Sequence, residues 1–100
     1  MGKPRIMLRM LVNLPAVVVS AVAVEIAPAD PHRRRIFIVQ SSANPVRIGA
    51  AGVTAATGYR LGQNERMQLE GPECPTDAIY AIREGGADGN VSCLVDRRRT

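Results

Sequence analysis

The chain has 100 residues, of which 46% are hydrophobic and only 3% aromatic, and its formal net charge is +4. This length leaves room for one compact core and excludes a second full-sized domain. Because burial must rest on aliphatic side chains that contribute only about 1.5–3 kcal/mol each, we expect the chain to cover further surface with copies of itself.

The first quarter of the chain has the pattern of paired strands. Ile6, Leu8, Met10 and Val12 fall on one side of a two-residue period, which predicts a strand. The β-branched run over 16–26 predicts a second strand. Two prolines within 27–31 then indicate an exposed connection. We therefore divide the chain into an N-terminal arm or hairpin, 1–27, and a β-sandwich domain, 28–100.

The same segment also has features of a secretory signal peptide. An apolar run from Leu11 to Val24 follows basic residues and contains Ala21-Val22-Ala23, which is typical of a cleavage site. Pro15 interrupts the run, which is shorter than the roughly 20 residues of a membrane span. We expect the segment to be retained and no membrane to be involved. A secreted carbohydrate- or surface-binding β-module is the alternative.

The remainder of the chain predicts short strands separated by turns. The stretch 34–41 has apolar residues on both faces, which is typical of a central strand covered on both sides. Met67 and Leu69 alternate with polar residues and predict one buried face and one wet face. Further strands are expected over 46–49, 59–61, 65–70, 78–83 and 91–96. The predicted fold class is all-β, a small antiparallel β-sandwich or partly closed barrel with an extended N-terminal arm or hairpin.

The inventory of chemically active side chains does not assemble a catalytic site. His32 is the only histidine and stands beside Pro31 and a basic cluster, which favours a solvated loop residue over a base. One histidine and two separated cysteines cannot supply the roughly four ligands of a structural zinc site. We expect Cys74 in a loop and Cys93 in the core, as inert thiols in preference to a disulfide. We predict no enzyme activity, cofactor, metal or small-molecule substrate.

Two arginine triplets mark the ends of predicted strands. A nucleic-acid reader would combine such charges with stacking aromatics or a groove-binding helix, which this sequence does not offer, so nucleic acid is not an expected partner. Solvated strand ends, pairing with an acidic patch on a partner protein and phosphate contact remain open. The candidate interface residues are Arg5, Arg9, Arg33, Arg34, Arg35, Arg97, Arg98 and Arg99.

Five blocks of strand and turn residues follow one another between Ile26 and Asp96. They are Ala29-Asp30-Pro31-His32-Arg33-Arg34, the strand 36–41, the pair 45–49 and 52–61, the strand 65–70, and Ala78-Ile79-Tyr80-Ala81-Ile82. The stretch in which they lie spans about two-thirds of the chain. In this order they resemble a family of small β-rich virion proteins of tailed phages and prophages. Asp30 and Gln63-Asn64 depart from the family pattern, which usually has asparagine and a proline-glycine turn there.

The resemblance implies a structural virion protein that binds and stabilises the outer surface of a tailed-phage capsid, as a decoration or cement protein. The implied partners are the major capsid protein and copies of the chain itself in a homo-oligomer, with a trimer favoured. The implied location is the capsid exterior, with assembly in the host cytoplasm. A head-spike, vertex or tail component is the alternative. Residues 1–25 lie outside the resemblance, and we expect them to form an arm that adds a strand to a neighbouring subunit.

Overall fold

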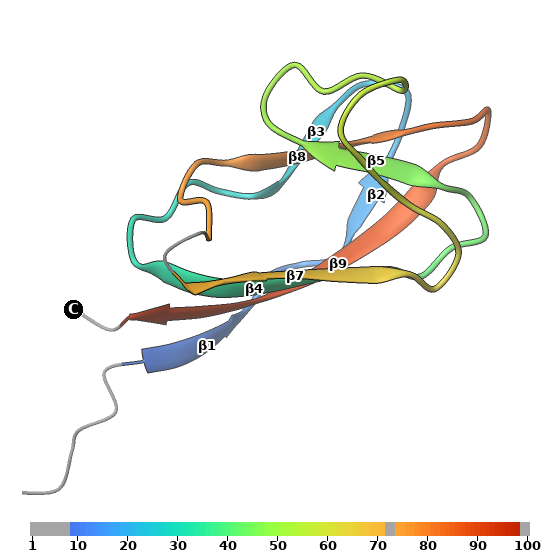
Figure 1. Ribbon diagram of the computed structural model, residues 1–100. Helices are drawn as coiled ribbons and strands as arrows, with labels where there is room; N and C mark the ends of the chain where they lie inside the picture. The colour runs from blue at the N-terminus through green and yellow to red at the C-terminus, as the bar shows by residue number, and fades with distance from the viewer. Residues whose placement is uncertain (1–8, 72–73, 99–100) are drawn as a thin grey trace, which may run out of the picture.

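The computed structural model describes residues 9–71 and 74–98, without the side chain of Arg9. The described residues form nine strands in two antiparallel sheets that pack together (Figure 1). Sheet A has the order β1 (Arg9–Asn13), β9 (Gly89–Arg98), β4 (Arg33–Gln40) and β7 (Arg66–Glu70), and β2 (Val17–Val19) also pairs with β9. Sheet B has the order β3 (Val24–Ala27), β8 (Ile79–Arg83), β5 (Val46–Gly49) and β6 (Tyr59–Leu61). The all-β fold is confirmed, as a sandwich and not a closed barrel.

The core lies between the two sheets and is built from alternate residues of the strands. In β4, for example, Ile36 and Ile38 are fully buried because a strand turns every second side chain to the same face. As the composition predicts, aliphatic side chains fill most of this space, and both cysteines are buried among them. The buried cluster comprises Val19, Ile26, Ala27, Ile36, Ile38, Val46, Ile48, Leu61, Cys74, Ile79, Ala81, Val91, Cys93 and Val95.

The strand predicted over 16–26 is two strands that belong to different sheets. β2 pairs with β9 in sheet A, and β3 pairs with β8 in sheet B, so the chain crosses between the layers at residues 20–23. At this corner the N–H of Val22 donates to the hydroxyl of Ser20 at 3.4 Å. A serine hydroxyl offers the backbone such a local alternative to strand pairing. The single-strand prediction is wrong because the β-branched pattern runs on through the corner unchanged.

The segment before residue 27 contributes to both sheets. β1 pairs antiparallel with the end of β9, from Arg9 opposite Arg98 to Asn13 opposite Leu94. Val19, Ile26 and Ala27 are buried in the common cluster. The domain boundary at residue 27 stays a prediction. Across the described ranges, no helix is long and apolar enough to cross a membrane.

β4 is central in its sheet but covered on one face only. It pairs with β9 on one side and with β7 on the other, which confirms the predicted central position. Sheet B packs against the face that carries Ile36 and Ile38. On the opposite face Phe37 is half-buried and Val39 is 38% exposed. The prediction of cover on both sides is therefore wrong for the single chain, because the sandwich supplies a second layer to only one face.

Candidate interaction surface

The chemically reactive side chains are dispersed or buried. Among residues 9–71 and 74–98, no three His, Cys, Asp or Glu side chains gather in a way that would hold a metal. Cys74 and Cys93 are both free and buried. Burial raises the pKa of the Cys93 thiol to about 11 and also raises that of Cys74. Both thiols are thus protonated at neutral pH and unreactive, as the sequence predicts. His32 is half-buried in the turn before β4.

The first arginine of β4 is buried inside the fold. Arg33 is 3% exposed, and its guanidinium donates hydrogen bonds to the carbonyl oxygens of Pro28 at 2.5 Å, Pro75 at 2.6 Å and Asp77 at 3.1 Å. These contacts join the connection before β4 to the segment before β8. Its Nε is buried without a hydrogen-bond partner in the described part of the chain. Arg33 therefore ties together segments that are distant in the sequence.

Two further arginines are neutralised by carboxylates. Arg97 donates through Nε and Nη2 to the two carboxylate oxygens of Asp30, at 2.7 and 3.1 Å. The hydrogen bond from Arg97 is the main cause that lowers the pKa of Asp30. Arg35 lies 3.0 Å from the buried carboxylate of Asp96 and places its guanidinium 5.5 Å from the centre of the Phe37 ring. Such planar pairs suit the arginine fork.

Two other arginines have no carboxylate partner in the described part of the chain. Arg34 is half-buried, and Arg98 is exposed at the end of β9. Arg5, Arg99 and the side chain of Arg9 lie outside the described residues. Because β4 begins where β9 ends, the register brings five predicted site residues to one end of sheet A, namely Arg33, Arg34, Arg35, Arg97 and Arg98. Their role at an interface stays a prediction.

The outward side of sheet A carries an apolar patch, which we call the A face. It consists of Leu11, Phe37, Val39 and Leu94. Phe37 and Leu94 lie opposite each other on β4 and β9. Val39 is two residues further along β4, and Leu11 is 65% exposed on β1. Neighbouring strands thus place four large apolar side chains on one surface. An exposed apolar patch of this kind marks an interaction site.

Polar side chains of both charges border the A face, and one of them, Asp96, stands directly opposite Leu11. Arg35 lies 3.8 Å from Glu70 in addition to its contact with Asp96. Arg66 and Gln68 of β7 stand opposite Val39 and Phe37 in the register and are exposed. An apolar centre with a polar, charged rim is the usual anatomy of a protein–protein contact.

The outward side of sheet B has a different character. Arg47 and Arg60, on neighbouring strands, both bind the carboxylate of Glu84, at 2.7 and 2.9 Å. The hydrogen bond from Arg60 is the main cause that lowers the pKa of Glu84. These side chains remain partly exposed to water. The two outer surfaces are therefore unequal, with an ion network over β5 and β6 and the apolar patch on sheet A.

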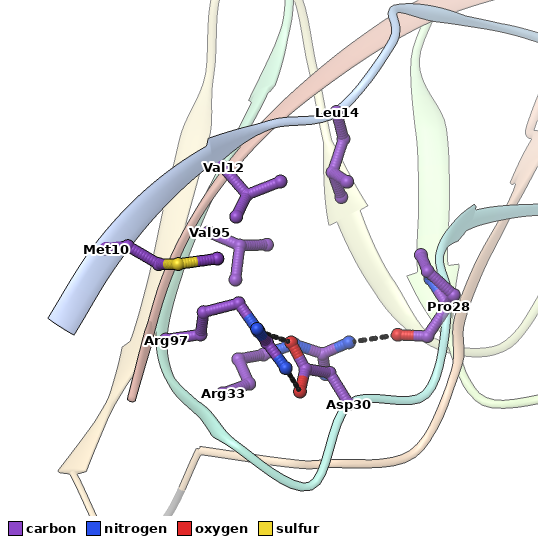
Figure 2. Close-up of a pocket in the computed structure, with 8 residues that line it drawn as sticks. All are labelled: Met10, Val12, Leu14, Pro28, Asp30, Arg33, Val95 and Arg97. Atoms are coloured by element: carbon purple, nitrogen blue, oxygen red, sulfur yellow. Dashed lines mark hydrogen bonds and ion pairs between the residues drawn. The ribbon is translucent and has the colours of Figure 1, made fainter. Parts of the chain in front are cut away.

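A cleft of about 300 Å³ lies beneath β1 (Figure 2). Its wall on the sheet A side is formed by Met10, Val12, Leu14 and Val95. Pro28 lines the other side, and Figure 2 shows the ion pair of Asp30 and Arg97 at one end. The inward side chains of β1 therefore contact an open apolar space, whereas those of the strands further inside the sheet contact the packed core.

The comparisons with known proteins give structural likenesses only. No family model matches the chain, and no curated protein matches it. A chain of the cyanophage Pam1 capsid asymmetric unit is similar, with a TM-score of 0.45 and 15% identity over 100% of this chain and 93% of that chain. At this identity and TM-score the likeness assigns no role to any residue of the chain.

Sequence reasoning missed the A face, although the signal was present. The stretch 34–41 was apolar on both sides, and this was interpreted as cover by two layers of the same chain. The structure supplies one layer only. β4 has apolar residues on both faces but lies in an outer layer, and this combination indicates a partner on its exposed face.

Proposed function

We propose that this chain is a non-catalytic structural protein of a tailed-phage particle, which binds the outer surface of the capsid and stabilises it. The observation that carries the proposal is that only one face of β4 is covered. Its inner face is filled by sheet B, while Phe37 and Val39 on the other face remain accessible together with Leu94. The sequence resemblance to virion proteins of tailed phages supplies the kind of particle.

The A face has the properties that attachment to a lattice requires. Burial of apolar surface contributes about 25 cal/mol per Å², and a standard interface covers about 800 Å² on each partner. Phe37, Val39 and Leu94 form the centre of such an area, and Leu11 extends it onto β1. The charges of Arg35, Asp96, Glu70 and Arg66 beside them fix its orientation. The proposed partners are capsid subunits, at points where several of them meet, and copies of the chain itself.

Binding to the assembled state alone would stabilise the particle by mass action. A ligand that binds only the assembled form raises its stability by about 2.7 kcal/mol at a hundredfold excess over Kd. The protein therefore requires no reactive group for this function. It requires a binding site that several capsid subunits form together only after assembly.

Quantitative mass spectrometry of purified particles tests the proposal. A copy number that approaches that of the major capsid protein is expected. A copy number that is a small fraction of it points to the alternative, a head-spike, vertex or tail component. A particle without the protein refutes a virion role of either kind.

A surface substitution tests which face binds. Val39→Glu places a carboxylate on the A face, opposite Arg66 on β7, so the sheet keeps a favourable cross-strand pair. The matched control is Val22→Glu, because Val22 is 75% exposed at the corner between β2 and β3. We expect particles to lose the Val39→Glu protein and retain the Val22→Glu protein. Equal occupancy by both would show that attachment does not use the A face.

A further inference from the structure

The described strands leave four edges, and three of them are protected against pairing with another chain. β7 exposes Arg66 and Glu70. β6 has only three residues, one of them the exposed Arg60. β3 carries the exposed Glu25 and a register shift directly after it. Charged side chains, short length and bulges are the devices by which edge strands avoid unwanted strand addition.

β1 is the least protected edge, because its only charged residue, Arg9, stands at its first position. Residues 10–24 contain no charged side chain. β9 is its only partner among the described strands, so one side of β1 offers unpaired N–H and C=O groups. Leu11 is 65% exposed in the middle of this strand. A strand of this kind gains from a partner that completes its hydrogen bonds and covers its leucine.

We propose that the β1 edge is an interface between two copies of this chain, in which the two β1 strands pair antiparallel about a two-fold axis at Leu11. In this register Leu11 lies opposite Leu11, Met10 opposite Val12, and Arg9 opposite Asn13. No like charges face each other, and two of the three kinds of pair are apolar. The contact is self-complementary, as a two-fold interface must be.

The distribution of charge selects a second copy in the antiparallel direction. Arg97 and Arg98 lie beside the start of β1. Antiparallel pairing places the basic ends of the two copies at opposite ends of the joined edge, whereas parallel pairing would bring them together. A strand whose basic residues all lie at one end therefore fits its own copy in this orientation.

The same arrangement accounts for two further features. The cleft beneath β1 is lined by Met10 and Val12, and the partner brings its own Val12 and Met10 to the same level of the sheet. A two-fold axis perpendicular to the sheet also keeps both A faces on one side. The inference thus deepens the proposed function, since the pair would present one continuous apolar face to a capsid.

Cysteine cross-linking of the full chain tests the register. Cross-strand Cβ atoms lie about 4.5–5.5 Å apart, near the separation that a disulfide can bridge. We expect oxidised Leu11→Cys protein to migrate as a covalent dimer without reductant. Val39→Cys, on the same face but two strands inside the edge, is the control and should form no covalent dimer. The native thiols are buried and give little background. A Leu11→Cys protein that links no better than Val39→Cys overturns the proposal.

Sedimentation velocity supplies the second test. The wild-type protein should sediment as a dimer, and Leu11→Lys should shift it to a monomer, because two ammonium groups would then face each other. Val22→Lys is the control and should leave the dimer intact, and circular dichroism checks that each variant is folded. A wild-type protein that sediments as a monomer or as a trimer overturns this interface. A dimer that persists in Leu11→Lys overturns it as well. Capsid occupancy is measured separately, so a monomer that still binds particles rejects the edge contact and leaves the proposed function standing.

Discussion

Replacement of Arg33 by methionine should destabilise the fold more than any other arginine substitution in the described part of the chain. Methionine keeps most of the side-chain length but removes donors that now reach the carbonyl oxygens of Pro28, Pro75 and Asp77. Each hydrogen bond from a charged donor contributes about 1.5–3 kcal/mol. The two shortest bonds alone amount to about 3 kcal/mol at the low end of this range. The low end applies because Pro28 and Asp77 are exposed residues, where water can partly replace the lost donor.

Urea unfolding followed by circular dichroism measures this difference. For a domain of this size, about 3 kcal/mol corresponds to a fall in Tm of roughly 12–24 °C. Arg34→Met is the matched control, because Arg34 has no carboxylate partner in the described residues. It should change the free energy of unfolding by less than about 0.5 kcal/mol. If Arg33→Met and Arg34→Met unfold at the same urea concentration, Arg33 is not a structural tie and the reasoning fails.

Three further predictions concern acid stability, thiol reactivity and a turn. Arg97 lowers the pKa of Asp30, so the pair stabilises the fold above the unfolded pKa of about 3.9, and this contribution is lost as pH falls through the lower folded value. Asp30→Asn should therefore show a smaller loss of stability in urea titrations below about pH 4. With its pKa raised to about 11, Cys93 should react with iodoacetamide at pH 8 only after denaturation, as measured by mass spectrometry. Gly58→Ala should lower Tm more than Gly52→Ala. Both residues have positive φ, but a Cβ at Gly58 would lie 2.5 Å from a main-chain oxygen of β5, whereas none lies near Gly52.

Local patterns predicted the strands well because side-chain alternation is a local property. The bounds expected for β5 and β6 agree with the structure, and those for β4, β7 and β8 agree within one residue at each end. The corner at 20–23 and the pairing of β1 with the distant β9 were not predictable in the same way. Alternation shows which residues share a face, but it contains no information about which strand lies beside them.

The arginine triplet before β4 shows a second limit. Strict alternation would place Arg33 and Arg35 on the same face of the strand. The structure has a register shift between these two residues, so Arg33 turns into the fold while Arg35 remains on the outer face beside Phe37. A single-residue irregularity of this kind has no signature in a run of three identical residues. The sequence could therefore identify the basic cluster but could not distinguish its buried member.

The proposed edge contact and the A face lead to a prediction about binding strength. Two faces held on one rigid sheet turn the second contact with a lattice into an intramolecular event, which raises avidity by about 10²–10⁴ where the spacing matches. The Leu11→Cys protein allows a direct comparison, because reductant changes the link between copies and leaves Phe37, Val39 and Leu94 of the A face unchanged. Diluted until the reduced form is monomeric, the oxidised dimer should dissociate from particles at least about tenfold more slowly than the reduced form. Equal dissociation rates would mean that the lattice engages one face at a time, and that the dimer geometry does not match the spacing of its binding sites.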